Sequence, residues 1–106
     1  MNLESASYKN TIDSGVQEYR ETPHSVLVDV RTSQEYNQGH IPGSINIPLQ
    51  EITEIFQRIP DKNTPLFVYC HSGMRSAKAA DILTRAGYQA VKNIGGIMLY
   101  NGSLEL

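Results

Sequence analysis

The amino-acid sequence predicts an α/β fold in which helices cover both faces of a mostly parallel sheet of about five short strands. Residues 26–30 and 66–70 are nearly continuous apolar runs, which are typical of strands covered on both faces of a parallel sheet. Two further segments place apolar residues at helical spacing. A chain of 106 residues is long enough for one core, so we expect a single domain over residues 1–106.

The first half of the chain supplies one helix and two strands. Asp13 is placed to cap a first helix that carries Val16 and Tyr19, and Gly15 lowers the helix propensity of this segment. The first apolar run follows as a buried strand. A weaker strand is expected at residues 44–47.

Amphipathic helices flank the second apolar run. The core-facing positions are Leu49, Ile52, Phe56 and Ile59 in the earlier helix, and Ala79, Ile82, Leu83 and Ala86 in the later one. Pro60 ends the earlier helix, and Gly87 ends the later one because glycine adopts the left-handed conformation of a helix C-terminus. A last, weaker strand is expected at residues 90–94.

Charge and composition exclude several classes of protein. The net charge is −2 and the 9 Lys and Arg residues are scattered, so we expect no nucleic-acid partner. Residues 1–15 contain no apolar run, so we expect neither a secretory signal nor a membrane anchor, and a cytoplasmic protein. Nothing in the sequence requires a dimer, and a monomer is expected.

Cys70 is the only cysteine, which excludes an internal disulfide. The sequence has no Cys-x-x-Cys or His-x-x-x-His spacing for a structural zinc ion. We therefore expect neither a metal nor an organic cofactor, and Cys70 is expected to be a free thiol.

The segment Cys70 to Ser76 joins the end of a buried strand to the start of a helix. In open parallel sheets, ligands bind beyond the carboxyl ends of the strands. A loop that turns over a helix N-terminus points backbone N–H groups inward, and the helix dipole adds positive potential that suits an anion. Gly73 lets the backbone turn, and Arg75 can offer a forked cation to a ligand with two or three oxygens.

The same positive potential favours the thiolate form of Cys70. Lowering a thiol pKa from about 8.5 to about 6.5 requires about 2.7 kcal/mol. Charge-assisted hydrogen bonds of about 1.5 to 3 kcal/mol each, with up to about 2 kcal/mol from a helix terminus, meet that requirement. A lone cysteine is more often a small core residue, but the polar residues that follow favour a nucleophile. We expect the pKa of Cys70 to lie below neutrality, so that no separate general base is needed.

Five segments carry recognisable motifs: Val28 to Arg31, Glu35 with Tyr36, Gly39 to Pro48, Cys70 to Ser76, and Gly95 to Ile97. In this order and at this separation they resemble the rhodanese family, specifically its single-domain members. The resemblance covers nearly the whole chain and implies a rhodanese-like fold. Tyr100 departs from the family pattern because it stands where a tryptophan is common, and the tail Asn101 to Leu106 is short, which is expected to expose one rim of the pocket.

The resemblance implies sulfur transfer. Cys70 would attack the sulfane sulfur of thiosulfate or of a persulfide, hold it as a Cys70 persulfide, and pass it to a thiol or to cyanide. The implied substrate-binding residues are the rest of the loop: His71, Ser72, Gly73, Met74, Arg75 and Ser76. Ser76 is expected either to hydrogen bond to the sulfur or to cap the helix.

Two other functions stay open at this point. Phosphatases and arsenate reductases with a related loop have one more residue, whereas four residues separate Cys70 from Arg75 here, which favours sulfur. A non-catalytic docking module is the other alternative. Because Arg75 is the only certain positive charge in the loop, we expect thiosulfate to bind weakly. His71 and Met74 favour a less charged donor, such as glutathione persulfide or a persulfide on another protein.

Asp29 and Arg31 are expected to be structural residues near the site rather than catalytic ones. Glu35 is expected at the start of a short helix, where a carboxylate complements the helix dipole. His40 is expected to be a hydrogen-bonded turn residue, and His24 and His71 are expected to face solvent.

Overall fold

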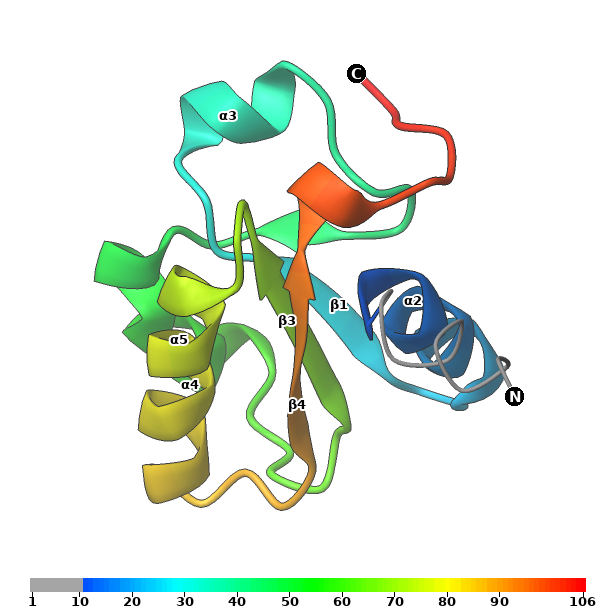
Figure 1. Ribbon diagram of the computed structural model, residues 1–106. Helices are drawn as coiled ribbons and strands as arrows, with labels where there is room; N and C mark the ends of the chain where they lie inside the picture. The colour runs from blue at the N-terminus through cyan, green and yellow to red at the C-terminus, as the bar shows by residue number, and fades with distance from the viewer. Residues whose placement is uncertain (1–10) are drawn as a thin grey trace.

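We describe the protein from a computed structural model that defines residues 11–106. The sheet is parallel and its strand order is β2-β1-β3-β4 (Figure 1). The strands are β1 (Val26–Asp29), β2 (Ile45–Asn46), β3 (Leu66–Cys70) and β4 (Val91–Gly96). A strand is found at each predicted place, but the expectation of about five strands is wrong for residues 11–106, where the sheet has 4. The tail adds only an isolated bridge between His40 and Glu105.

Helices lie on both faces of this sheet, which confirms the α/β class (Figure 1). One face is covered by α2 (Thr11–Glu21), and the other by the 3-10 helix η1 (Leu49–Glu54), α4 (Ile55–Arg58) and α5 (Met74–Arg85). The short α3 (Ser33–Asn37) and the 3-10 helix η2 (Ile97–Leu99) lie beyond the carboxyl ends of the strands.

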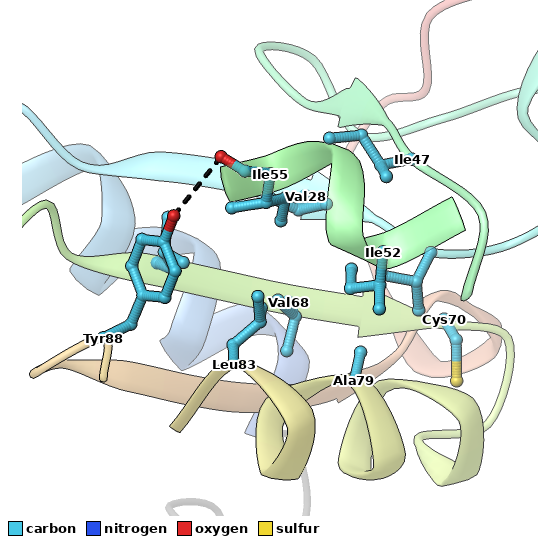
Figure 2. Packing of buried hydrophobic residues seen from close by; sticks show 11 residues of the cluster. Val28, Ile47, Ile52, Ile55, Val68, Cys70, Ala79, Leu83 and Tyr88 are labelled. Carbon is cyan, nitrogen blue, oxygen red and sulfur yellow. Dashed lines mark hydrogen bonds between the residues drawn. The ribbon is translucent and has the colours of Figure 1, made fainter. Parts of the chain in front are cut away.

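Each face of the sheet has its own apolar core. Val28 and Val68 point towards α4 and α5, where they contact Ile55 and Leu83 in the cluster drawn in Figure 2. Leu27 of β1, together with Phe67 and Tyr69 of β3, belongs to a second cluster that packs against α2. Its buried members are Ile12, Val16, Leu27, Ile41, Phe67, Tyr69 and Ile94. Both central strands are therefore buried on two faces, which explains their continuous apolar sequence.

The predicted first helix is present as α2, but the role expected of Asp13 is wrong. Asp13 lies inside the helix and is not its cap; its carboxylate accepts hydrogen bonds from the backbone N–H and the side-chain amide of Asn101, both at 3.0 Å. Gly15 is buried, and a Cβ at this position would lie 2.4 Å from the Cβ of Ile94. The glycine is therefore required for the close approach of α2 to β4.

The single helix predicted between Leu49 and Pro60 is in fact a 3-10 segment followed by one α-helical turn. A 3-10 helix has three residues per turn, so Ile52 and Ile55 share the buried face. Phe56, predicted to face the core, is turned outward and is 36% exposed. Its ring stacks on Tyr88, with the ring centroids 6.2 Å apart.

The prediction for α5 is confirmed. Ala79 and Leu83 are buried, and the helix ends before Gly87, whose φ is +108° and whose N–H donates to the carbonyl of Thr84. Among residues 11–106, no helix has the length and apolar character needed to span a membrane.

The tail after η2 runs back towards α3. Tyr100, which replaces the expected tryptophan, packs against the α2 side of the core, and its hydroxyl oxygen accepts a hydrogen bond from Arg20 at 3.4 Å. The backbones of His40 and Glu105 exchange hydrogen bonds of 2.9 and 2.8 Å. The tail is thus fixed beside the carboxyl ends of the strands.

Candidate active site

Cys70 is the last residue of β3, which is one of the two central strands, and it pairs with Gly96 of β4. Its sulfur lies near the start of α5 (Figure 2). Gly73 turns the loop into the helix with a φ of +103°, a conformation that favours glycine. The residue Cys70 is only 1% exposed, so the thiol lies beneath the loop rather than on the surface.

Two groups from the loop and from α5 contact the Cys70 sulfur. The N–H of Gly73 donates to Sγ at 3.0 Å, and the hydroxyl of Ser76 lies 3.4 Å from it. Burial acts to raise the pKa of the thiol, but the Ser76 hydroxyl and the backbone N–H groups of Ser76, Gly73 and Ser72 outweigh it and lower that pKa. The hydrogen-bond donors around Sγ thus stabilise the thiolate by more than burial destabilises it.

Ser76 is fully buried and occupies the third position of α5, while Gly73 is the N-cap, so the serine does not serve as the cap. Its hydroxyl oxygen lies 3.2 Å from the carbonyl oxygen of Gly73 and 2.7 Å from Oδ1 of Asn93. Asn93, on β4, also contacts Gly73 and Gly95. No sequence pattern points to Asn93, which lies 23 residues beyond Cys70 and shares no motif with it.

Arg75 does not point its guanidinium fork into the loop. Its two Nη groups donate to Oε1 and Oε2 of Glu35 at 2.8 and 3.0 Å. The hydrogen bonds from Arg75 lower the pKa of Glu35 to about 2, and hydrogen bonds from Thr32 add to this effect. Glu35 is the third residue of α3, whose capping box with Thr32 fixes the carboxylate in place. The pairing of Glu35 with Arg75 was not predicted.

Asp29 and Arg31 form a buried ion pair at the end of β1. Arg31 donates from Nη2 to Oδ2 of Asp29 at 2.7 Å and to the carbonyl of Gly39 at 2.8 Å. The exposed fractions of Asp29 and Arg31 are 0% and 6%, so neither charge is free for a ligand. The pair ties the strand end to the turn that follows α3.

The three histidines have different environments. The Nδ1 atom of His40 lies 3.0 Å from the carbonyl oxygen of Tyr36, and its ring stacks on that of Tyr36. His24 is exposed in a turn, with a φ of +64°. The side chain of His71 is exposed, while its carbonyl accepts a hydrogen bond from the N–H of Met98.

A hollow of about 390 Å³ lies beside the segment Cys70 to Ser76, which we call the cysteine loop. The residues that line it are Arg31, Glu35, Gln38, Gly39, His71, Ile97 and Leu104. Exposed apolar side chains near this end of the molecule include Met74, Met98, Leu99 and Leu104, with exposed fractions of 80%, 58%, 58% and 51%. A second hollow of about 340 Å³ lies at the opposite end of the sheet, where β3 and β4 begin, away from the thiol.

The two glycines of the segment Gly95 to Ile97 are required for different reasons. Gly95 has a φ of +106° and lies at the irregularity in the pairing of β4 with β3. Gly96 has ordinary backbone angles, but a Cβ there would lie 2.2 Å from the carbonyl oxygen of His71 and 2.5 Å from Cα of Ser72. Gly96 is therefore needed for space directly beneath the cysteine loop.

The fold and the loop define a class of protein: a parallel α/β domain with a thiol held at the carboxyl end of a central strand. The rhodanese-like domain model matches residues 13–103, and the chain belongs to this family. It is 46% identical over 71 residues to the thiosulfate sulfurtransferase PspE of Escherichia coli, covering 66% of this chain and 68% of that one. It is 38% identical over 94 residues to a sulfurtransferase of Allochromatium vinosum, covering 86% and 87%.

A solved structure confirms the fold. A rhodanese with anions from E. coli superposes with a TM-score of 0.71 at 40% sequence identity, covering 76% of this chain and 96% of that one. The relatives are named as sulfurtransferases, in agreement with the family implied by the motifs.

Proposed function

We propose that this protein is a sulfurtransferase in which the Cys70 thiolate carries the sulfur. The thiolate attacks the outer, sulfane sulfur of the donor and forms a new S–S bond. The donor's own bond to that sulfur breaks, and the leaving group departs with the electron pair, as a thiolate from a persulfide or as sulfite from thiosulfate. An acceptor thiolate or cyanide then attacks the terminal sulfur, and Sγ leaves as the thiolate.

The observation that carries this proposal is the hydrogen bonding of Cys70. Sγ receives the Gly73 N–H at 3.0 Å and has the Ser76 hydroxyl at 3.4 Å, at the start of a helix. These donors lower the pKa of the thiol. Donors that stabilise a charged sulfur assist both the attack by Cys70 and its departure as a thiolate, so the proposed transfers use no separate general acid or base.

The same surroundings disfavour a phosphatase. Cleavage of a phosphate ester benefits from an acid that protonates the leaving oxygen. Glu35 is the carboxylate that contacts Arg75 of the loop, and its pKa of about 2 keeps it ionised at neutral pH. Asp29 is buried in its pair with Arg31. Neither group is suited to supply that proton.

We infer that the preferred donor carries less charge at its reacting end than thiosulfate, as in glutathione persulfide or a persulfide on another protein. Thiosulfate brings two negative charges to the loop, where the Arg75 fork is already bound by Glu35. The apolar side chains of Met74 and Leu104 beside the loop suit the body of an organic or protein donor. Thiosulfate is expected to be a slower substrate than a persulfide.

The experiment is intact mass spectrometry of the pure protein after exposure to thiosulfate, and separately to glutathione persulfide. We expect the mass of one added sulfur atom, reversed by cyanide and absent in Cys70→Ser. Protein whose thiol has been alkylated beforehand is the second control. A lack of added sulfur with every donor would favour the docking module, and hydrolysis of p-nitrophenyl phosphate would favour the phosphatase.

A further inference from the structure

Asn93 lies on β4 and contacts two residues of the cysteine loop, Gly73 and Ser76, as well as Gly95 of its own strand. Its Oδ1 accepts a hydrogen bond from the N–H of Gly95 at 3.0 Å, and its Nδ2 donates to the carbonyl of Gly73 at 3.1 Å. These two contacts fix which end of the amide is oxygen. If the ends were exchanged, the amide NH₂ would face the N–H of Gly95, and the amide oxygen would face the carbonyl of Gly73. Oδ1 therefore faces Ser76.

The Ser76 hydroxyl has one hydrogen and more than one acceptor. Oδ1 of Asn93 lies 2.7 Å from the hydroxyl oxygen, and Sγ of Cys70 lies 3.4 Å from it. The shorter contact has the length of a good O–H···O hydrogen bond. A neutral thiol is a weak acceptor, so the hydroxyl donates to Asn93 while the sulfur is uncharged. When the sulfur is a thiolate, the charge makes it the stronger acceptor.

We propose that Asn93 is a positioning residue that competes with Cys70 for the Ser76 hydroxyl. The hydroxyl turns from Asn93 onto Sγ when that sulfur is charged, and it returns to Asn93 when a persulfide moves the charge to the terminal sulfur. The hydroxyl rotates about its C–O bond and keeps its proton, so no other reactant is needed. This inference rests on Cys70 being the nucleophile of the proposed function.

The competition predicts a direction for the acidity of the thiol. Removing the Asn93 acceptor leaves the Ser76 hydroxyl with two acceptors, the carbonyl oxygen of Gly73 at 3.2 Å and Sγ of Cys70 at 3.4 Å. The charged sulfur is the stronger of the two, so Asn93→Ala favours the thiolate. Ser76→Ala removes the donor and disfavours it. If Asn93 acts through Ser76, the effect of Asn93→Ala disappears when Ser76 is already alanine, which is the signature of two coupled residues.

The measurement is the rate of alkylation by iodoacetamide as a function of pH, for the wild type, both single variants and the double variant. We expect Asn93→Ala to increase the thiolate fraction below the midpoint by about threefold to tenfold, equal to a downward shift of about 0.5 to 1 in the midpoint pH. No such shift is expected in the Ser76→Ala background. The charged groups around the thiol, namely Arg75 with Glu35 and Asp29 behind it, are the same in all four proteins.

Equal shifts in the two backgrounds, an upward shift, or no shift would each overturn the proposal. Asn63→Ala, at an exposed turn, is the matched control and should leave the midpoint unchanged. Asn93→Leu, which is closer to asparagine in volume, repeats the test if Asn93→Ala lowers the unfolding temperature. Alkylation requires no sulfur donor. The inference about Asn93 can therefore fail while sulfur transfer is observed, and it can hold while sulfur transfer is absent.

Discussion

At Arg75 the guanidinium already has a ligand, since Glu35 holds both Nη groups at 2.8 and 3.0 Å. The sequence places this arginine correctly in the cysteine loop but leaves its partner unidentified. Glu35 lies 40 positions earlier in the chain, and its motif is also explained by the capping box with Thr32. The carboxylate reaches the loop through the tertiary placement of α3, and the contact of Arg31 with the Gly39 carbonyl holds the turn after that helix.

Glu35→Gln is expected to change donor preference. Removing one negative charge beside the loop should raise kcat/KM for thiosulfate about threefold to tenfold, because a dianion loses the repulsion of a nearby anion. The value for glutathione persulfide should change less, since the group that enters the loop carries less charge. The measurement compares steady-state rates with the two donors at low and at high salt.

Glu54→Gln, at an exposed position of η1, is the matched control for this charge change. Its donor preference should equal that of the wild type. An equal change in kcat/KM for both donors in Glu35→Gln would mean that Glu35 acts on the structure of the loop rather than on the charge that the donor meets.

At the scale of the elements, β4 supports the cysteine loop from below. Gly96→Ala would place a methyl group 2.2 Å from the carbonyl oxygen of His71, so the loop backbone must move. We expect the N–H of Gly73 to lose its contact with Sγ, and the midpoint of iodoacetamide alkylation to rise. Stability should fall by about 1 to 3 kcal/mol, as is usual when a packed core receives an extra methyl group.

Gly15→Ala provides the comparison, because it overpacks the other face of β4. Its Cβ would lie 2.4 Å from Cβ of Ile94. This variant should lose stability in urea unfolding by a similar amount, while its alkylation midpoint stays closer to that of the wild type. Equal alkylation midpoints for the two variants would show that Gly96 does not act through the loop.

The elements that follow from local sequence were predicted well. β1 and β3 are buried on both faces and read as apolar runs, and α5 has a regular apolar stripe that ends at Gly87. The apolar spacing after Leu49 predicts the wrong type of helix. Ile52 and Phe56 are spaced for the same face of an α-helix, whereas Ile52 and Ile55 are spaced for the same face of a 3-10 helix, and the sequence fits both patterns. Helix propensity does not explain why position 15 is glycine, because the reason is its close contact with Ile94 on another element.

At the scale of the whole molecule, the candidate site combines a local part with a long-range part. The local part, Cys70 with Gly73 and Ser76, lies within seven residues of sequence and was predicted as a group. The long-range part consists of Glu35 from α3 and Asn93 from β4, which reach the loop only through the sheet order. Sequence spacing carries no information about such contacts, so neither partnership could be predicted.

The Glu35 to Arg75 contact also joins α3 to α5 across the end of the sheet, so it should contribute to stability in a pH-dependent way. The pKa of Glu35 is about 2 in the folded protein, against an ordinary value of 4.5. A carboxylate with a lowered folded-state pKa stabilises the protein fully above the unfolded-state value, and this stabilisation is lost as the pH falls towards the folded-state value. The relevant window is therefore between pH 4.5 and about 2.

The test is urea unfolding of the wild type and of Glu35→Gln at several pH values. The wild type should be the more stable protein at pH 6, and its advantage should shrink as the pH falls from 4.5 towards 2. The side chains of Arg75 and Glu35 are 37% and 33% exposed, so water screens the pair and the advantage should be smaller than for a buried pair. Comparing the two proteins at each pH cancels the protonation of the other carboxylates, which they share. A difference that is constant over this range would mean that Glu35 stabilises the fold through the backbone of α3, by capping, rather than through its charge on Arg75.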